Sequence, residues 1–158
     1  MGVEAVRGPA ASTIRAFREA DAAAATEILK ASPEAGQWTE RGFRELQGWR
    51  GVLALVSEHR RRVCGFFIGR QVADEAEILN LAVEPLARRR GEGGALLKTA
   101  IDEFRARGVI RVFLEVRESN EGGIAFYERH GFLKTGRRAG YYRNPEEAAI
   151  VMEKTLAG

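Results

Sequence analysis

Hydrophobic and polar residues follow two different periods along this chain, and each period predicts one kind of element. Apolar runs and patterns that alternate with period two predict β-strands. The predicted strands cover residues 12–19, 52–57, 63–72, 77–83, 110–117, 132–142 and 148–154. Apolar residues that recur three and four positions apart predict amphipathic helices. The predicted helices cover residues 21–30, 39–50, 91–107 and 120–130.

The order of these elements, β-α-α-β-β-β-α-β-α-β-β, predicts the fold class. Asp21 is a good N-cap for the first helix, and Gly108 and Gly131 follow the last two helices where a glycine often ends a helix. A mixed sheet with helices packed on it follows, an α/β (α+β) fold with some parallel strand pairing. We expect one domain over residues 12–158, preceded by a flexible tail over residues 1–11.

The composition excludes several classes of protein without identifying a partner. Apolar residues make up 45% of the 158 residues, too many for a disordered chain. The 25 Lys and Arg against 22 Asp and Glu leave a formal net charge of +3, which argues against direct nucleic-acid binding. The single cysteine, Cys64, excludes an internal disulfide framework and a multi-cysteine zinc site. We find no signal peptide and no apolar run that could span a membrane, and expect a cytoplasmic protein without a metal.

A basic, glycine-rich loop lies between the predicted strand 77–83 and the predicted helix 91–107. Its residues are Arg88, Arg89, Arg90, Gly91, Glu92, Gly93 and Gly94. The unpaired N–H groups at a helix start favour an anion, and glycines let the backbone approach it closely. The loop is therefore a candidate diphosphate site, and a helix cap with solvated arginines is the alternative. A carboxylate at Glu92 would weaken such a site if it pointed into the loop.

Two further segments carry candidate acid–base residues. Glu115 lies in the middle of the predicted strand 110–117, among bulky apolar neighbours, where a carboxylate either pairs with an arginine or acts as a general base. Asn120 can cap the next helix or bind a ligand carbonyl. Tyr127 lies about two turns into that helix, as a buried aromatic residue or as a proton donor to a departing thiolate.

Other residues of interest have a structural interpretation as well as a functional one. Trp38 either packs in the core or forms a wall of an acceptor site. Cys64 stands in an apolar strand, which favours a core residue over a nucleophile. His59 and His130 show no spacing typical of a catalytic triad or of a metal site.

Four stretches together resemble the GNAT family of acetyl-CoA-dependent N-acetyltransferases. They are ILNLAV (78–83), LEVRESN (114–120), AFYERHGF (125–132) and RRAGYY (137–142), and the Arg-x-x-Gly-x-Gly loop from Arg88 to Gly93 supports them. The resemblance covers residues 12–156. It implies the GNAT fold, with a central sheet of about six to seven strands, about four flanking helices, and splayed strands that bind acetyl-CoA.

The resemblance also implies a role for each matching residue. Glu115 would be the general base, Tyr127 the general acid, and Tyr141, Tyr142 and Trp38 would shape the acceptor site. The residues that would bind acetyl-CoA are Leu81, Ala82, Val83, Arg88, Arg89, Arg90, Gly91, Glu92, Gly93, Gly94, Asn120 and Tyr127. Two positions depart from the family pattern. Glu92 stands where an apolar residue is common, and both Ala139 and Gly140 separate Arg137-Arg138 from Tyr141-Tyr142.

Within the family, the chain most resembles enzymes that acetylate the N-terminal alanine of a ribosomal protein. The implied partners are acetyl-CoA and the N-terminus of a ribosomal or other protein, without a membrane or direct nucleic-acid contact, and we expect a monomer or a weak dimer. Two alternatives stay open. One is an acetyltransferase for a small-molecule amine or a lysine side chain, and the other is a CoA-binding module without catalysis.

Overall fold

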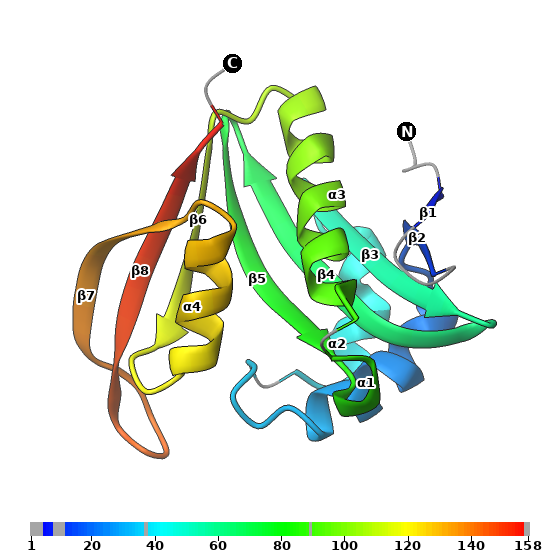
Figure 1. The fold of residues 1–158 in the computed structure, drawn as a ribbon, viewed down its shortest axis with the longest axis horizontal. Helices are drawn as coiled ribbons and strands as arrows, with labels where there is room; N and C mark the ends of the chain where they lie inside the picture. Colours follow the sequence, from blue (N-terminus) through cyan, green and yellow to red (C-terminus); the bar gives the residue numbers. More distant parts are fainter. Residues whose placement is uncertain (1–4, 8–11, 37, 89, 157–158) are drawn as a thin grey trace.

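One mixed sheet runs through the whole molecule (Figure 1). A computed structural model describes residues 5–7, 12–36, 38–88 and 90–156. The strands are β1 (Val6–Arg7), β2 (Thr13–Ala16), β3 (Val52–His59), β4 (Arg62–Val72), β5 (Glu75–Val83), β6 (Arg111–Arg117), β7 (Leu133–Tyr142) and β8 (Glu147–Thr155). Their order in the sheet is β1-β2-β3-β4-β5-β6-β8-β7. The pairing of β5 with β6 is parallel and the other pairings are antiparallel.

Helices cover both faces of this sheet (Figure 1). They are α1 (Ala22–Lys30), α2 (Glu40–Arg44), α3 (Glu92–Ala106) and α4 (Glu121–Arg129), with single 3₁₀ turns η2 (Glu19–Asp21), η3 (Glu45–Gly48) and η4 (Pro85–Ala87). Helices α3 and α4 bury Leu97, Phe104 and Ile124 in the larger apolar core. Helices α1 and α2 bury Ile28 and Phe43 in a second core on the opposite face.

The structure confirms the predicted fold class and the predicted helices, with two differences in detail. The segment predicted as helix 39–50 is the short helix α2 followed by the 3₁₀ turn η3, and Thr39 caps it by accepting the Gly42 N–H at 3.0 Å. Within the predicted tail 1–11, Val6–Arg7 pairs with β2 and makes an eighth strand, and residues 1–4 and 8–11 lie outside the described residues.

Asp21 stands at the start of α1, as predicted, but its side chain does not cap that helix. Instead, the buried carboxylate accepts two hydrogen bonds from the Arg15 guanidinium, both at 2.9 Å, and one from the Arg18 N–H at 2.7 Å. Burial by itself would raise the pKa of Asp21, but these hydrogen bonds outweigh it and hold the pKa below its usual value. Asp21 therefore occupies the predicted N-cap position without a side-chain cap, and its carboxylate instead joins β2 to η2 through an ion pair.

Strands β5 and β6 separate soon after they begin (Figure 1). Their parallel pairing covers only Glu75–Glu77 on β5 and Arg111–Phe113 on β6. Beyond these residues, the facing edges of the two strands are open to other partners. This divergence matches the splayed strands that the sequence predicts.

A β-bulge lies where β5 leaves β6. The register between β4 and β5 shifts by one residue, so that Ile68 pairs with Asn80, Gly69 pairs with Ile78, and Leu79 has no partner on β4. The extra residue reverses the alternation of side chains along the strand. As a result, Ile78 and Leu81 both face the core under α3, and Ala82 faces the core under α1 and α2.

Candidate functional site

The open edge of β5 offers backbone groups to an extended ligand. Glu84 donates its N–H to the Cys64 carbonyl at 2.8 Å, so the alternation of an antiparallel ladder turns the backbone groups of Ala82 toward β4. The backbone groups of Leu81 and Val83 consequently point to the edge that faces β6. Ala82, which was also predicted to bind the cofactor, has no free backbone group on this edge.

The start of α3 presents three further N–H groups. Gly91 precedes the helix in the left-handed region, with φ +79°, and the first helical hydrogen bond runs from the Ala95 N–H to the Gly91 carbonyl at 3.0 Å. The N–H groups of Glu92, Gly93 and Gly94 precede that bond and have no helical acceptor. Together with the helix dipole, they make this terminus suitable for a diphosphate.

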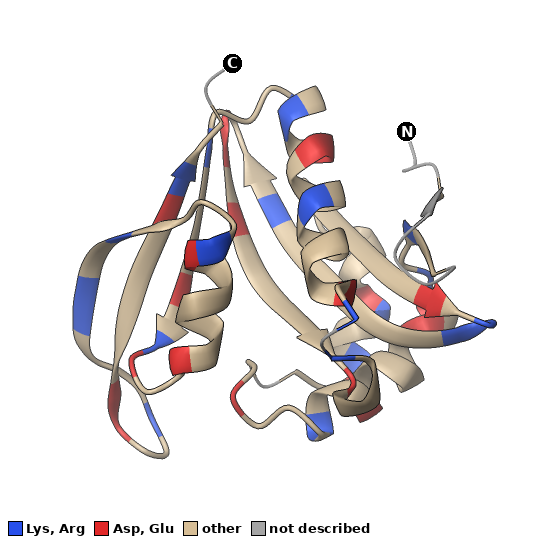
Figure 2. Ribbon diagram, in the orientation of Figure 1, with Lys and Arg blue, Asp and Glu red and all other residues tan. Residues whose placement is uncertain are grey.

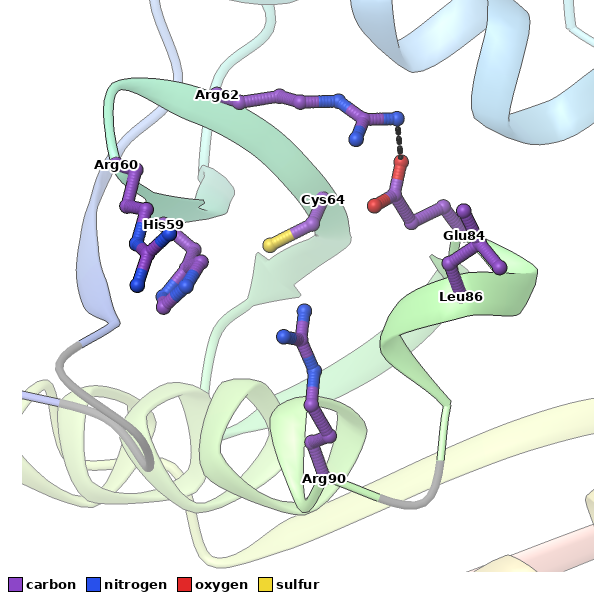
Figure 3. A pocket seen from close by; sticks show the side chains of 7 residues that line it. All are labelled: His59, Arg60, Arg62, Cys64, Glu84, Leu86 and Arg90. Carbon is purple, nitrogen blue, oxygen red and sulfur yellow. Dashed lines mark hydrogen bonds and ion pairs between the residues drawn. The ribbon is translucent and has the colours of Figure 1, made fainter.

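The predicted arginines of this loop do not act alike. Arg88 donates from Nε to the Val83 carbonyl at 3.1 Å and from Nη2 to the Ser32 hydroxyl at 2.9 Å, so its side chain holds the loop to its neighbours. Arg90 is exposed, and Arg89 lies outside the described residues. Arg90 lines a pocket of about 250 Å³ with residues of the β3–β4 hairpin and of η4 (Figure 3). The other residues that line it are His59, Arg60, Arg62, Cys64, Glu84 and Leu86.

Glu92 points away from the loop and into the molecule. Its side chain is 1% exposed and accepts hydrogen bonds from the hydroxyl of Ser12, at 2.5 Å, and from that of Ser57. The carboxylate therefore does not enter the mouth of the candidate diphosphate site. The carboxylate nevertheless leaves a buried negative charge at the start of α3, and this helix terminus is the one that would hold the anion.

Two glycines of the loop have a packing role that the sequence did not indicate. A Cβ atom added at Gly94 would lie 3.0 Å from His130 Nε2, and one added at Gly93 would lie 3.4 Å from the Phe126 ring. These glycines thus let the start of α3 approach the end of α4 closely. From the sequence, the close approach of a ligand was the predicted reason for glycine at these positions. Close packing against α4 is a second reason.

Glu115 lies on β6, and its side chain is 15% exposed. It accepts from Arg138 Nη1, at 3.0 Å to Oε1 and 3.2 Å to Oε2. The Arg138 guanidinium also lies over the ring of Tyr141, 4.4 Å from its centroid. The ion pair with an arginine, which was the alternative left open for Glu115, is therefore present. Through Arg138 it joins β7 to the candidate base.

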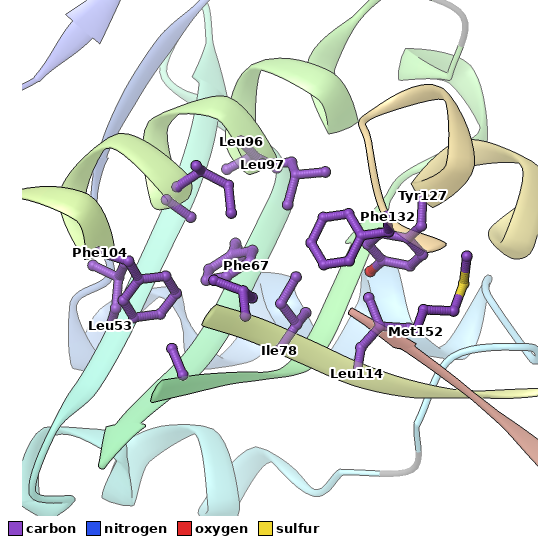
Figure 4. Close-up of a cluster of buried hydrophobic side chains, with 14 of the residues drawn as sticks. Leu53, Phe67, Ile78, Leu96, Leu97, Phe104, Leu114, Tyr127, Phe132 and Met152 are labelled. Carbon is purple, nitrogen blue, oxygen red and sulfur yellow. The ribbon is translucent and has the colours of Figure 1, made fainter. Parts of the chain in front are cut away.

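Tyr127 lies on α4 and is 9% exposed (Figure 4). Its ring packs against Phe126 and Phe132, with centroids 5.1 and 5.4 Å apart. Its hydroxyl has no hydrogen-bond partner among the described residues, and it is not one of the polar atoms sealed from solvent. Burial raises the pKa of Tyr127 above its ordinary value, so the phenol keeps its proton at neutral pH.

The two candidate proton-transfer residues approach the opening between β5 and β6 from opposite faces of the sheet. Tyr127 belongs to the core under α3 and α4, together with Leu114 and Val116 of β6. Glu115 is the intervening residue of that strand, so its side chain points to the other face. A ligand held along the open edge of β5 would therefore meet a proton donor on one face and a carboxylate on the other.

Three other predicted residues surround this opening. Asn120 caps α4, since its Oδ1 accepts the Gly123 N–H at 2.9 Å. Tyr142 is half-buried, with the Arg117 guanidinium 4.4 Å from its ring centroid. Burial, assisted by the charge of Glu115, raises the pKa of Tyr142 to about 12. Tyr141 is 44% exposed at the end of β7.

Trp38 and Cys64 are mainly packing residues. The Trp38 ring lies 5.3 Å from that of Phe43 and 5.5 Å from that of Trp49, against the core under α1 and α2. Cys64 is 2% exposed, and burial raises the pKa of its thiol. The thiol is thus a poor nucleophile, as the sequence predicted.

Sequence reasoning missed Glu77, an acidic residue that faces the same side of the sheet as Glu115. The available signal was an acid inside an otherwise apolar strand, E-A-E-I-L, two positions before the bulge. Burial and the negative charge of Glu115 both raise the pKa of Glu77.

No group of three or more metal-ligating side chains occurs among the residues that the structure describes. In the same part of the chain, no helix is long and apolar enough to cross a membrane.

Comparison with known proteins identifies the family. The sequence profile of the "Acetyltransferase (GNAT) family" matches residues 22–132, more than half of the chain. The chain belongs to the GNAT family. It is an acetyl-CoA-dependent N-acetyltransferase, and its open β5 edge and α3 terminus suit the pantetheine and diphosphate of that cosubstrate.

Several GNAT relatives are similar over most of their length. The "[Ribosomal protein bS18]-alanine N-acetyltransferase" of Salmonella typhimurium is 40% identical over 144 residues, which cover 89% of this chain and 95% of that protein. The putative enzyme of the same name from Bacillus subtilis is 32% identical and covers 81% of this chain and 85% of that protein.

Solved GNAT structures agree with this match. The ribosomal-protein-S18-alanine N-acetyltransferase of Escherichia coli superposes with a TM-score of 0.80 at 37% identity, covering 93% of this chain and 96% of that one. Ard1 from Thermoplasma volcanium superposes with a TM-score of 0.84 at 29% identity, covering 93% of this chain and 99% of that one.

Proposed function

We propose that this enzyme transfers an acetyl group from acetyl-CoA to the N-terminal alanine of ribosomal protein bS18. The observation that carries the proposal is the 40% identity to an enzyme of that name, over 89% of this chain and 95% of the relative. The site supports it, because an acceptor ammonium must lose a proton to a base before it attacks and the departing thiolate must gain one from an acid. One candidate for each role flanks the opening of the sheet.

The cosubstrate would lie along the open edge of β5. The backbone groups of Leu81 and the N–H of Val83 would pair with the amides of its pantetheine arm, as a further strand would, while the Val83 carbonyl accepts from Arg88. The N–H groups of Gly93 and Gly94 and the side chain of Arg90 would hold its diphosphate. When bound, acetyl-CoA supplies a thioester carbonyl that an unprotonated amine attacks.

Glu115 would remove the proton that keeps the acceptor amine unreactive. An N-terminal ammonium has a pKa of about 7.7–8.0, so a modest base suffices near neutral pH. Tyr127 would donate its phenolic proton to the departing thiolate from the opposite face. Cys64 would form no covalent intermediate, since its buried thiol lies beside Ser57, away from both groups.

The acceptor would enter on the face that carries Glu115. Tyr141 and Tyr142 are held there by the guanidinium groups of Arg138 and Arg117. The two rings pack edge to face, with centroids 5.1 Å apart, and together offer one apolar wall beside a peptide backbone. Trp38 would contribute only through the position of the segment between α1 and α2, because its ring packs on Phe43.

A CoA-release assay with three acceptors tests the proposal. The acceptors are a peptide with the first residues of bS18, the same peptide carrying a blocked α-amine and one free lysine, and a polyamine. We expect release with the first only. Release with the lysine peptide or the polyamine, and none with the first, would assign a different acceptor.

Glu115→Gln tests the role of the base in the same assay. We expect turnover to fall roughly a hundredfold or more, the usual effect of losing a general base. Glu118→Gln is the matched control, because Glu118 also pairs with an arginine of β7, Arg137 at 2.7 Å, but is exposed. If both substitutions lowered turnover equally, the loss would come from a broken ion pair with β7 and would not identify Glu115 as the base.

A further inference from the structure

Two carboxylates on adjacent strands share the face of the sheet where the acceptor would bind. Glu77 pairs in register with Phe113 of β6, and Glu115 is two residues further along that strand, so both side chains point to the same face. Figure 2 shows acidic positions on both β5 and β6 near the opening. The charge of Glu115 reaches Glu77, since it contributes to the raised pKa of that residue.

Among the described residues, Arg138 is the arginine that forms an ion pair with one of these two carboxylates. Arg138 contacts both oxygens of Glu115, and none of the described residues forms an ion pair with Glu77. Arg70 lies directly opposite Glu77 on β4, but its Nε donates to the Arg50 carbonyl at 3.3 Å. The cluster of Glu77, Glu115 and Arg138 thus carries a net charge of −1, and the Arg70 guanidinium across the strand pair forms no ion pair with it.

Other charged residues near the cluster already have partners. Arg117 pairs with Glu147, at 3.2 Å, and Arg137 pairs with Glu118. Arg111 lies between Glu75 and Glu153, which it binds from β6. Each of these arginines would have to break an ion pair with another carboxylate before it could neutralise Glu77.

The neighbouring positions of β8 and β7 carry short, uncharged side chains. The β8 residues that pair with Glu115 and Arg117 are Val151 and Ala149, and Gly136 of β7 faces Val151. None of them carries a charge that could pair with a carboxylate of the cluster. The pKa of the nearby Tyr142 phenol is raised to about 12, so the phenol stays neutral and adds no negative charge of its own.

We propose that Glu77 is an acceptor-binding residue, and that the Glu77–Glu115 pair binds the α-ammonium of the substrate beside Arg138. The ammonium supplies the missing positive charge before Glu115 removes its proton. This assignment rests on the proposed function and adds a residue to it. It assigns Glu77 to the recognition of a charged N-terminus, whereas the proton transfer stays with Glu115.

Equilibrium binding of two peptides to the CoA-loaded full-length enzyme tests Glu77 without turnover. One peptide begins with the free N-terminal alanine of bS18, and the other is its Nα-acetylated form, which has no ammonium. We expect Glu77→Gln to weaken binding of the free-amine peptide about tenfold, the loss typical of one charge-assisted contact, and to leave binding of the acetylated peptide unchanged. Equal loss for both peptides, or no loss, would overturn the assignment.

Glu75→Gln is the matched control, since Glu75 lies on the same strand and face but is paired with Arg111. We expect it to leave the difference between the two peptides unchanged. A second test uses the wild-type enzyme, in which no substitution can disturb folding. If the assignment is right, the wild type binds the free-amine peptide more tightly than the acetylated one. Acetylation of the free-amine peptide by wild type, together with no effect of Glu77→Gln, would refute this inference and leave the proposed function standing.

Discussion

Tyr127→Phe removes one oxygen atom from the candidate acid and leaves its aromatic packing in place. A positioned general acid contributes about 10²–10⁴-fold to a rate, which corresponds to about 2.7–5.5 kcal/mol of activation free energy. We therefore expect turnover to fall within this range. The raised pKa of Tyr127 keeps the phenol protonated through neutral and mildly alkaline pH, so the loss in turnover should be the same at pH 7 and pH 9.

The same substitution should leave the fold almost unchanged. The Tyr127 ring keeps its contacts with Phe126 and Phe132, and the hydroxyl has no partner among the described residues. The free energy of unfolding should thus change by no more than about 0.5 kcal/mol. Tyr127→Ala, in contrast, removes a ring that is 9% exposed and should cost about 3–5 kcal/mol.

The assay combines CoA release at saturating acetyl-CoA with urea unfolding of the same preparations. A large loss of turnover with unchanged stability for Tyr127→Phe supports proton donation by the phenol. Full turnover in Tyr127→Phe would refute it, whatever the stability. A loss of turnover that parallels a loss of stability would mean that the ring positions α4 and that the hydroxyl has no chemical role.

Three further substitutions test other parts of the account. Glu92→Gln removes a buried negative charge at the start of α3 and should tighten CoA binding roughly threefold to tenfold in calorimetry; weaker binding would contradict this reading. Asp21→Asn should lower the free energy of unfolding in urea by about 2–4 kcal/mol at pH 7. Because the folded-state pKa of Asp21 is lowered, this difference should shrink as the pH falls below about 4 and through that pKa; a constant difference would exclude the ion pair with Arg15. Cys64→Ala should leave turnover within about twofold, whereas a hundredfold loss would indicate an acyl-enzyme.

Local signals predicted the elements well, because each signal acts within a few residues. Gly108 and Gly131 end the last two helices with φ values of +85° and +89°, in the conformation that glycine adopts most easily. Asn120 caps α4 as its residue type suggested. The glycine-rich loop, with Gly91 in the left-handed region, likewise lies between a strand and a helix as predicted.

Features that depend on distant residues escaped prediction. Glu92 is buried because Ser12, 80 residues away in sequence, and Ser57 provide hydrogen bonds to it. Arg88 is held by Ser32 rather than being free for a phosphate. No local pattern contains these partners, so the loop motif alone could not assign its side chains.

The β-bulge at Leu79 explains why the face of each β5 residue was also hard to predict. Partly buried and fully buried residues alternate along the whole strand, as they would in a regular strand. The register shows that the extra residue, Leu79, nevertheless reverses the alternation of side chains between the two faces. Glu77 lies before this bulge, and the backbone groups of Leu81 and Val83 lie after it. In the proposed site, a strand that looks uninterrupted would thus present a carboxylate to the acceptor and its open edge to acetyl-CoA.

The position of the transferred acetyl group tests the central claim most directly. A peptide with the N-terminal sequence of bS18 and an internal lysine is incubated with the enzyme and acetyl-CoA, and fragment-ion mass spectrometry locates the acetyl group. The proposed function predicts a single acetyl group on the α-nitrogen of the alanine, lost when Glu115→Gln replaces the wild type. Acetylation of the lysine, or no acetylation of a peptide that the wild-type enzyme binds, would contradict it.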